Sequence, residues 1–181
     1  MINPEHKPWP FSPRGVLEKL SQGRDVVLAA IGDSLTYGWM VDQGYLDFLR
    51  QTLRSRYPAS RLTVVNRGVP GDTADNGLRR IRRDVLDLSP DGVLVQYALN
   101  DAFMGYTPQS FRRSLEGMIE EIRADGEAEI VLVTSVYLEE PREYERALLF
   151  YGEMEGLARK YRLPLARVHS HWEQRILSGT D

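Results

Sequence analysis

Apolar and polar residues alternate in blocks along this chain. Five short runs are apolar at nearly every position, which is the pattern of strands buried on both faces of a sheet. These runs span residues 26–31, 62–66, 93–99, 130–135 and 163–168. The segments between them carry apolar residues at helical spacing and span residues 44–57, 73–88, 108–125 and 141–161. The pattern therefore predicts five strands with a helix between each strand and the next.

The helix predicted over residues 108–125 has the clearest signals at both ends. Thr107 is a favourable N-cap, and Pro108 fits the first helical turn. Gly126 follows the segment, at a position where helices commonly end. One face of the segment carries the apolar side chains of Phe111, Leu115, Met118, Ile119 and Ile122. This face is expected to pack on the sheet.

Buried strands that alternate with helices indicate a parallel sheet covered on both faces. We therefore expect an α/β fold: a three-layer α/β/α sandwich with the doubly wound strand order 2-1-3-4-5. The 181 residues fit one domain, 1–181, without internal repeats or linkers. The proline-rich start predicts an arm over residues 1–20 on the surface of that domain.

Charge and cysteine content remove several classes of function. The net charge of −3 at pH 7 does not supply the basic surface that nucleic-acid binding requires. The basic cluster at residues 79–83 is followed by Asp84 and Asp87 and is predicted to be the solvated face of a helix. The absence of cysteine excludes disulfides, thiolate chemistry and cysteine-ligated metals.

The sequence indicates no cofactor, metal or membrane span. It contains no group of histidines and carboxylates with metal-ligand spacing, no G-x-G-x-x-G motif and no P-loop. No apolar run approaches the length of a membrane span, and no signal peptide is visible. A cytoplasmic location is the default expectation, and the oligomeric state is left open.

Polar and glycine-rich segments follow the predicted strands. They are residues 32–34, 67–73, 100–101, 136–137 and 169–171. Ligands of open parallel sheets bind beyond the carboxyl ends of the strands. These segments are therefore expected to share one edge of the sheet and to form the functional site.

Ser34 is the candidate nucleophile at this edge. It lies where a buried strand turns into a helical segment, so its hydroxyl is held at a rigid rim near unpaired backbone N–H groups. Such groups stabilise the oxyanion that forms after nucleophilic attack. The alternative is that Asp33 and Ser34 are turn and cap residues, which favour such junctions.

Two further segments supply candidate donors to an oxyanion. Gly71 lies in a glycine-punctuated loop ahead of a helix, and without a Cβ its backbone N–H can approach a reacting group closely. Asn100 follows the third apolar run, so its side-chain amide can point into the same space. With the N–H of the nucleophile's own turn, these groups would complete an oxyanion hole.

Three motifs resemble the first three conserved blocks of the SGNH, or GDSL-type, hydrolases. They are Gly32-Asp33-Ser34-Leu35, Gly71-Asp72-Thr73 and Ala98-Leu99-Asn100-Asp101, and they follow the family's order. The resemblance implies the flavodoxin-like, five-stranded SGNH hydrolase fold. It also implies Ser34 as nucleophile, with the Ser34 N–H, the Gly71 N–H and the Asn100 side chain as oxyanion donors. The reactions it implies are hydrolysis of acyl or acetyl carboxylic esters and of thioesters.

The chain departs from this family pattern in two places. The third block opens with Ala98, where the family has glycine. The C-terminal Asp-x-x-His block, which supplies the base and its orienting carboxylate in the family, is absent, so the domain is expected to lack its C-terminal end. The competing expectation is that His169 or His171 is the base. A third is that both are loop or helix-cap residues beside Trp172.

Two functional hypotheses follow. The first is a serine hydrolase that cleaves small-molecule carboxylic esters through an acyl-enzyme on Ser34, with thioesters as a further substrate class. The second is a catalytically silent binding domain that keeps the SGNH fold but lacks the base.

Asp33 and Asp72 either brace the site loops or merely stabilise turns. The candidate pocket or core side chains near these loops are Tyr37, Trp39, Phe103, Met104 and Tyr106.

Overall fold

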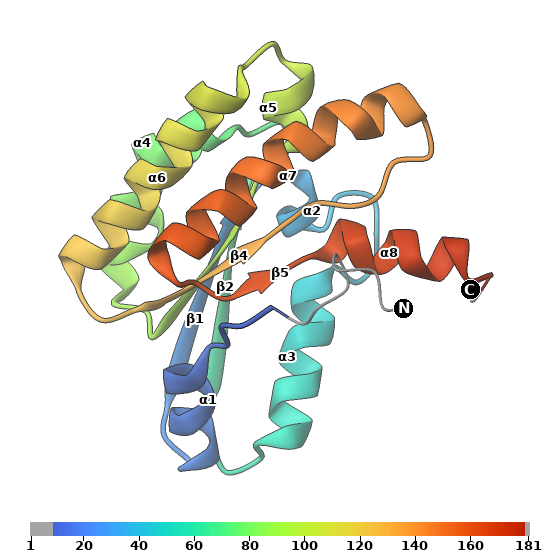
Figure 1. The fold of residues 1–181 in the computed structure, drawn as a ribbon. Helices are drawn as coiled ribbons and strands as arrows, with labels where there is room; N and C mark the ends of the chain where they lie inside the picture. The colour runs from blue at the N-terminus through green and yellow to red at the C-terminus, as the bar shows by residue number, and fades with distance from the viewer. Residues whose placement is uncertain (1–8, 180–181) are drawn as a thin grey trace.

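The computed structural model describes residues 9–179, which build a five-stranded parallel sheet (Figure 1). The strands are β1 (Val26–Gly32), β2 (Leu62–Gly68), β3 (Gly92–Gln96), β4 (Glu129–Val133) and β5 (Leu165–Ala166). They lie in the order β2-β1-β3-β4-β5, and each neighbouring pair is parallel. The predicted α/β fold and strand order are confirmed.

Helices cover both faces of this sheet. Their bounds are α1 (Arg14–Ser21), α2 (Ser34–Tyr37), α3 (Tyr45–Arg56), α4 (Ala74–Asp84), α5 (Leu99–Phe103), α6 (Pro108–Asp125), α7 (Pro141–Tyr161) and α8 (Val168–Leu177), with the short 3-10 helix η2 (Leu86–Leu88) after α4. Residues of α4, α6 and α7 belong to one buried cluster, and residues of α1 and α3 belong to a second. Figure 1 shows these two groups of helices on opposite sides of the strands.

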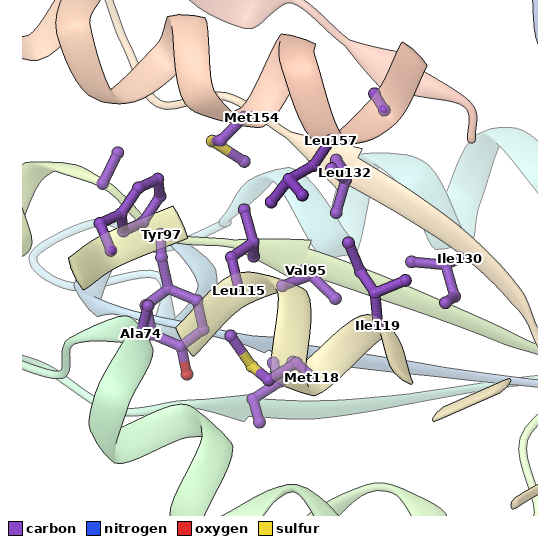
Figure 2. Packing of buried hydrophobic residues seen from close by; sticks show 14 of the residues in the cluster. Ala74, Val95, Tyr97, Leu115, Met118, Ile119, Ile130, Leu132, Met154 and Leu157 are labelled. Carbon is purple, nitrogen blue, oxygen red and sulfur yellow. The ribbon is translucent and has the colours of Figure 1, made fainter. Parts of the chain in front are cut away.

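The larger core lies between the sheet and helices α4, α6 and α7. In Figure 2, Met118 and Ile119 of α6 lie beside Val95 of the sheet, and Met154 of α7 lies above them. Helix α6 has the predicted bounds, and the five apolar residues predicted for its inner face are all buried. The hydroxyl of Thr107 accepts a hydrogen bond from the Ser110 N–H at 3.1 Å, which is the expected N-cap.

Three predicted strands end earlier in the structure: β4 ends at Val133 rather than at residue 135, and β3 and β5 end where their apolar runs lead into helices. Strand β3 ends at Gln96 rather than at residue 99, because Leu99 begins α5. Strand β5 contains only Leu165–Ala166, because Val168 begins α8. In both cases the apolar run continues into a helix, and hydrophobicity alone does not separate a strand end from a buried helix start.

The expected N-terminal arm contains a helix. Arg14–Ser21 forms α1, and its Val16 and Leu20 are buried against the sheet, four residues apart as on one helical face. Residues 1–8 of the expected arm lie outside the described residues. No helix within residues 9–179 is both long and apolar enough to cross a membrane.

Gly77 of α4 allows the close approach of Tyr97, and this contact generates a test. A Cβ at Gly77 would lie 2.4 Å from the Tyr97 Oη and 2.7 Å from its Cζ. We expect Gly77→Ala to lower the free energy of unfolding by about 1–3 kcal/mol, because the ring or the helix must move. In the control, Gly152→Ala in α7, a Cβ meets nothing within 4 Å, so a gain of about 0.5–1 kcal/mol is expected. Urea denaturation measures both changes, and equal changes would contradict the prediction.

Candidate active site

Three strand ends meet at one edge of the sheet. Gly32 of β1 pairs in register with Gly68 of β2 and with Gln96 of β3. The segments that follow these strands therefore begin at the same level. Ser34 begins α2 immediately beyond β1, and Asn100 lies in α5 beyond β3. The structure thus places Ser34 and Asn100 at the same edge, as expected.

The segment that carries Ser34 is capped by Asp33. The Asp33 carboxylate accepts hydrogen bonds from the Leu35 N–H at 2.9 Å and from the Gln96 Nε2 at 3.3 Å. The Asp33 side chain is buried, and burial raises its pKa to about 6. Asp33 therefore acts as a cap and also ties α2 to β3, while its supporting role in the reaction of Ser34 stays a prediction.

Two polar residues that the sequence analysis did not single out hold α2 in place. Gln96 accepts a hydrogen bond from the Thr36 Oγ1 at 2.8 Å and donates one to the Ser135 Oγ at 2.8 Å. Asn66 donates from its Nδ2 to the Thr36 backbone oxygen at 2.9 Å. The available signal was an amide side chain in a largely apolar run, at the end of the run for Asn66 and in its middle for Gln96.

The predicted oxyanion loop is joined to Asn100. Gly71 has a φ of +81°, in the left-handed region that glycine adopts without strain, and a Cβ built on it would face open space. The Asn100 Nδ2 donates to the backbone oxygen of Asp72 at 2.8 Å. That nitrogen carries two hydrogens, so one N–H remains for a substrate oxygen. Gly71 and Asn100 are therefore held together at this edge, while their convergence with the Ser34 hydroxyl on one substrate stays a prediction.

Asp101, the neighbour of Asn100, fixes the start of α4. Both of its carboxylate oxygens accept from the Ala74 N–H, at 3.0 and 3.3 Å. The side chain is fully buried, and burial raises its pKa to about 7, with Asp33 and Asp72 nearby adding to the shift. The carboxyl group joins the loop of the second motif to the helix of the third.

His169 is part of the core rather than an exposed side chain. Its Nδ1 is hydrogen-bonded to the Thr134 Oγ1 at 2.8 Å, and its ring stacks on Tyr151 with 4.5 Å between centroids. Burial, with the nearby Arg167 charge, lowers the pKa of His169 to about 4, so the imidazole is neutral at pH 7. His171, two residues along α8, is exposed. The role of either histidine as base stays a prediction.

The side chains considered for a pocket or for the core divide between surface and interior. Tyr37, Trp39, Phe103 and Met104 are exposed, by 54%, 57%, 44% and 62%. Tyr106 packs against the larger core. The first four therefore remain available to a substrate, whereas Tyr106 is partly buried.

An apolar cavity of about 730 Å³ lies on the α1 and α3 face of the sheet. Aliphatic side chains of the strands, such as Leu28, Leu94 and Val131, line it. Leu35, the neighbour of Ser34, also lines the cavity, as do Trp39 and the edge residues Gln96 and Ser135, so the cavity reaches the polar edge described above. Within the part of the chain that the structure describes, no three His, Cys, Asp or Glu side chains gather to bind a metal.

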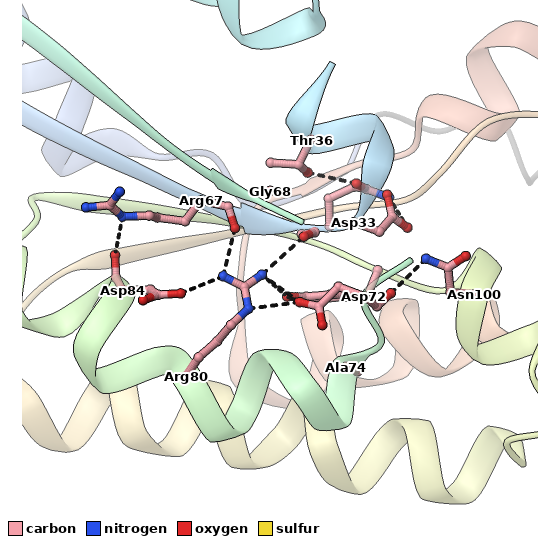
Figure 3. A network of polar contacts seen from close by, with 12 residues as sticks. Asp33, Thr36, Arg67, Gly68, Asp72, Ala74, Arg80, Asp84 and Asn100 are labelled. Carbon is pink, nitrogen blue, oxygen red and sulfur yellow. Dashed lines mark hydrogen bonds and ion pairs between the residues drawn. The ribbon is translucent and has the colours of Figure 1, made fainter. Parts of the chain in front are cut away.

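One prediction about charge is corrected at Arg80. The basic cluster at residues 79–83 was expected to be a solvated helix face, but the Arg80 side chain is only 11% exposed. Arg79, Arg82 and Arg83 are 75%, 64% and 77% exposed, as expected. Arg80 turns inward because acidic side chains and backbone carbonyl groups surround it (Figure 3).

A family comparison identifies the class to which this fold and edge belong. The GDSL-like lipase/acylhydrolase family matches residues 30–181. This range is most of the chain, and it contains all three sequence motifs and the edge that they form. The chain therefore belongs to the GDSL-like lipase/acylhydrolase family, which confirms the resemblance seen in the motifs.

Individual relatives agree with this assignment. The chain is 30% identical over 119 residues to the arylesterase of Vibrio mimicus, and 26% identical over 145 residues to thioesterase 1/protease 1/lysophospholipase L1 of Escherichia coli strain K12. These matches cover 65% and 76% of this chain, and 58% and 64% of the two relatives. The chain thus spans about three fifths of the length of these curated relatives.

A solved structure supports the fold. The acetylxylan esterase Axe2 from Geobacillus stearothermophilus matches with a TM-score of 0.75 at 19% identity. The match covers 83% of this chain and 80% of Axe2. At this identity the likeness concerns the arrangement of strands and helices.

The raised pKa of Asp101 generates a prediction about stability. Between its ordinary pKa of 3.8 and about 7, the folded protein holds a proton that the unfolded chain releases. The raised pKa therefore adds to the free energy of unfolding. This added stability is complete below about pH 4 and is lost as the pH rises through 7. We expect Asp101→Asn to flatten that part of the profile, because the amide oxygen still accepts from Ala74 and does not ionise. Urea titrations from about pH 4 to 8 test this, with Asp25→Asn as the exposed control; an unchanged slope in Asp101→Asn would contradict it.

Ala98, which stands where the family has glycine, generates a second prediction. Its φ of +142° lies in a region that residues with a Cβ rarely adopt. Ala102 is equally buried but lies within α5, so Ala102→Gly loses the same methyl group without relieving strain. We expect Ala98→Gly to unfold with a free energy at least about 1 kcal/mol higher than Ala102→Gly. Urea denaturation of the pair measures the difference, and equal stability would show that Ala98 is unstrained.

Proposed function

We propose that this protein is a serine hydrolase that cleaves carboxylic esters through an acyl-enzyme on Ser34. The observation that carries the proposal is the shared edge at which Ser34, the Gly71 loop and Asn100 follow neighbouring strands. Membership of the GDSL-like lipase/acylhydrolase family supports it. The relatives named arylesterase and thioesterase support ester and thioester chemistry.

The proposed reaction has two steps. The Ser34 Oγ attacks the carbonyl carbon of the ester while a base takes its proton, and the carbonyl oxygen becomes an oxyanion. The Ser34 N–H, the Gly71 N–H and the free N–H of the Asn100 amide donate to that oxyanion. The carbon–oxygen bond to the alcohol then breaks, and the alcohol leaves with the proton. Water attacks the acyl-enzyme in the same way and releases the acid with Ser34 restored.

Within this sequence, which lacks the family's Asp-x-x-His block, the candidates for the base are His169 and His171. A base near pH 7 works best with a pKa close to that pH. The pKa of His169 is about 4, and its Nδ1 is already engaged with Thr134, so its Nε2 is the nitrogen left to accept a proton. The exposed His171 is the second candidate.

The proposed substrates are small esters with an acyl or acetyl group. The exposed aromatic side chains Tyr37 and Trp39 directly follow the Ser34 turn and lie 6.2 Å apart between ring centroids, which suits contact with an apolar substrate group. Thioesters of the acyl-CoA type are the second substrate class to test. The cytoplasmic location stays a prediction.

The central experiment is hydrolysis of p-nitrophenyl esters from acetate to decanoate by the wild type and by Ser34→Ala. We expect Ser34→Ala to lose at least about 10³-fold in kcat/KM, because the other groups cannot replace the nucleophile. Ser55→Ala, an exposed serine in α3, is the matched control and should retain full activity. Ester hydrolysis that does not depend on Ser34 would contradict the proposal.

The same assay separates the candidate bases and the silent alternative. Loss of Ser34-dependent hydrolysis in His169→Gln, with retention in His171→Gln, would assign the base to His169, and the reverse result would assign it to His171. No Ser34-dependent turnover in the wild type, with ester binding retained, would instead favour a silent binding domain. Circular dichroism of each variant shows whether the fold is retained.

A further inference from the structure

Arg80 is an inward-facing arginine on the helix that follows the Gly71 loop. Its guanidinium group lies between the sheet edge and α4, as Figure 3 shows. It is 11% exposed, and the Asp72 carboxylate that it contacts is 6% exposed. A charged side chain at this depth is stable only when its hydrogen-bonding groups are satisfied.

All of the donor groups of Arg80 are engaged. The Nε and Nη2 both donate to Asp72 Oδ2, at 2.9 and 2.6 Å. The Nη1 donates to the Arg67 backbone oxygen at 2.8 Å and to Asp84 Oδ2 at 2.9 Å. The Nη2 also donates to the Gly32 backbone oxygen at 3.2 Å and to the Tyr97 Oη at 3.0 Å. These six contacts engage the Nε and both terminal nitrogens of the guanidinium, which carries five N–H groups in all.

The groups bound by Arg80 belong to the segments that carry the proposed site. Gly32 is the last residue of β1, two positions before Ser34. Asp72 follows Gly71, and its backbone oxygen accepts from Asn100. One guanidinium group therefore links the chain entering the nucleophile turn to the loop that presents the proposed oxyanion donors.

Arg80 also has an electrostatic effect on the loop. A buried carboxylate at Asp72, next to Gly71, would repel the negative charge that develops on the substrate oxygen. The two contacts from Arg80 balance that charge, and Tyr97 Oη donates to the same carboxylate oxygen at 3.1 Å. Asp72 can thus hold the loop without opposing the reaction.

We infer that Arg80 is a positioning residue for the oxyanion hole, an inference that rests on the proposed function. It acts through Asp72 and Gly32, because its own donors are committed to the protein. Lysine cannot replace it, since an ammonium group has three donors and no planar fork. Arg80→Lys keeps the positive charge but must release some of these contacts, so the loop loses its fixed position while the charge remains.

The test compares kcat and KM of the wild type, Arg80→Lys and Arg112→Lys on p-nitrophenyl esters. Arg112 is the matched control, because its Nη1 forms an ion pair with Glu153 at 2.9 Å between α6 and α7. We expect Arg80→Lys to lower kcat about 10²-fold with KM changed less than about threefold, as for loss of an oxyanion donor. Arg112→Lys should retain the wild-type kcat. An unchanged kcat in folded Arg80→Lys would overturn the inference.

Two further variants separate positioning from loss of folding. In Arg80→Ala, added guanidinium ion at a low, non-denaturing concentration should restore part of kcat, whereas sodium chloride at equal ionic strength should not. Asp72→Asn keeps the shape of that side chain and leaves Arg80 in place, and kcat should fall with KM nearly unchanged. Failure of both effects would also overturn the inference.

A measurement without turnover distinguishes this inference from the proposed function. In ¹⁵N NMR spectra, the amides of Gly71 and Asp72 and the side-chain amide of Asn100 should shift or broaden in Arg80→Lys, while the amides of α7 do not. If the wild type shows no Ser34-dependent hydrolysis, the proposed function is wrong. The NMR comparison of wild type and Arg80→Lys still tests whether Arg80 positions the loop. Unchanged Gly71, Asp72 and Asn100 signals would show that Arg80 does not position them.

Discussion

The site depends on the parallel pairing of β1 with a strand on each side. Gly32 lies opposite both Gly68 and Gln96, so three strands end at one level. The loops that follow β1, β2 and β3 therefore start side by side, and each needs only a few residues to reach the other two. A shift of one residue in either pairing would turn the side chains of that strand to the other face of the sheet and move its loop away.

Polar groups are concentrated in the interior at this edge, where burial is costly. The carboxylates of Asp33, Asp72 and Asp101 are all buried there, with Gln96 beside them. Each accepts hydrogen bonds from backbone or side-chain donors, which offsets the loss of water. The same side chains join α2 to β3 through Asp33 and Gln96, and α5 to the start of α4 through Asp101, so the residues that stabilise the edge also determine its geometry.

The sequence predicted the strand order and the edge well, because apolar runs and helical spacing report burial directly. It placed Ser34 and Asn100 beyond neighbouring strands for the same reason. It missed Arg80, because five-residue charge patterns do not reveal which side chain turns inward. The sequence feature that could have shown the inward position of Arg80 is its spacing from Gly77. Arg80 follows this buried residue by three positions and so lies on the inner side of α4. The end of β3 was missed because Tyr97 and Ala98 are as apolar as the strand before them.

The two faces of the sheet differ in how firmly their helices are attached. Helices α6 and α7 bury five and seven side chains, whereas α1 buries Val16 and Leu20 and α3 buries Leu46. Local opening costs least where few apolar contacts are lost. The α1 and α3 layer is therefore expected to open more readily than the α6 and α7 layer in sub-global fluctuations. The Gly71 loop is anchored to α4 on the opposite face, so such fluctuations leave its attachment intact.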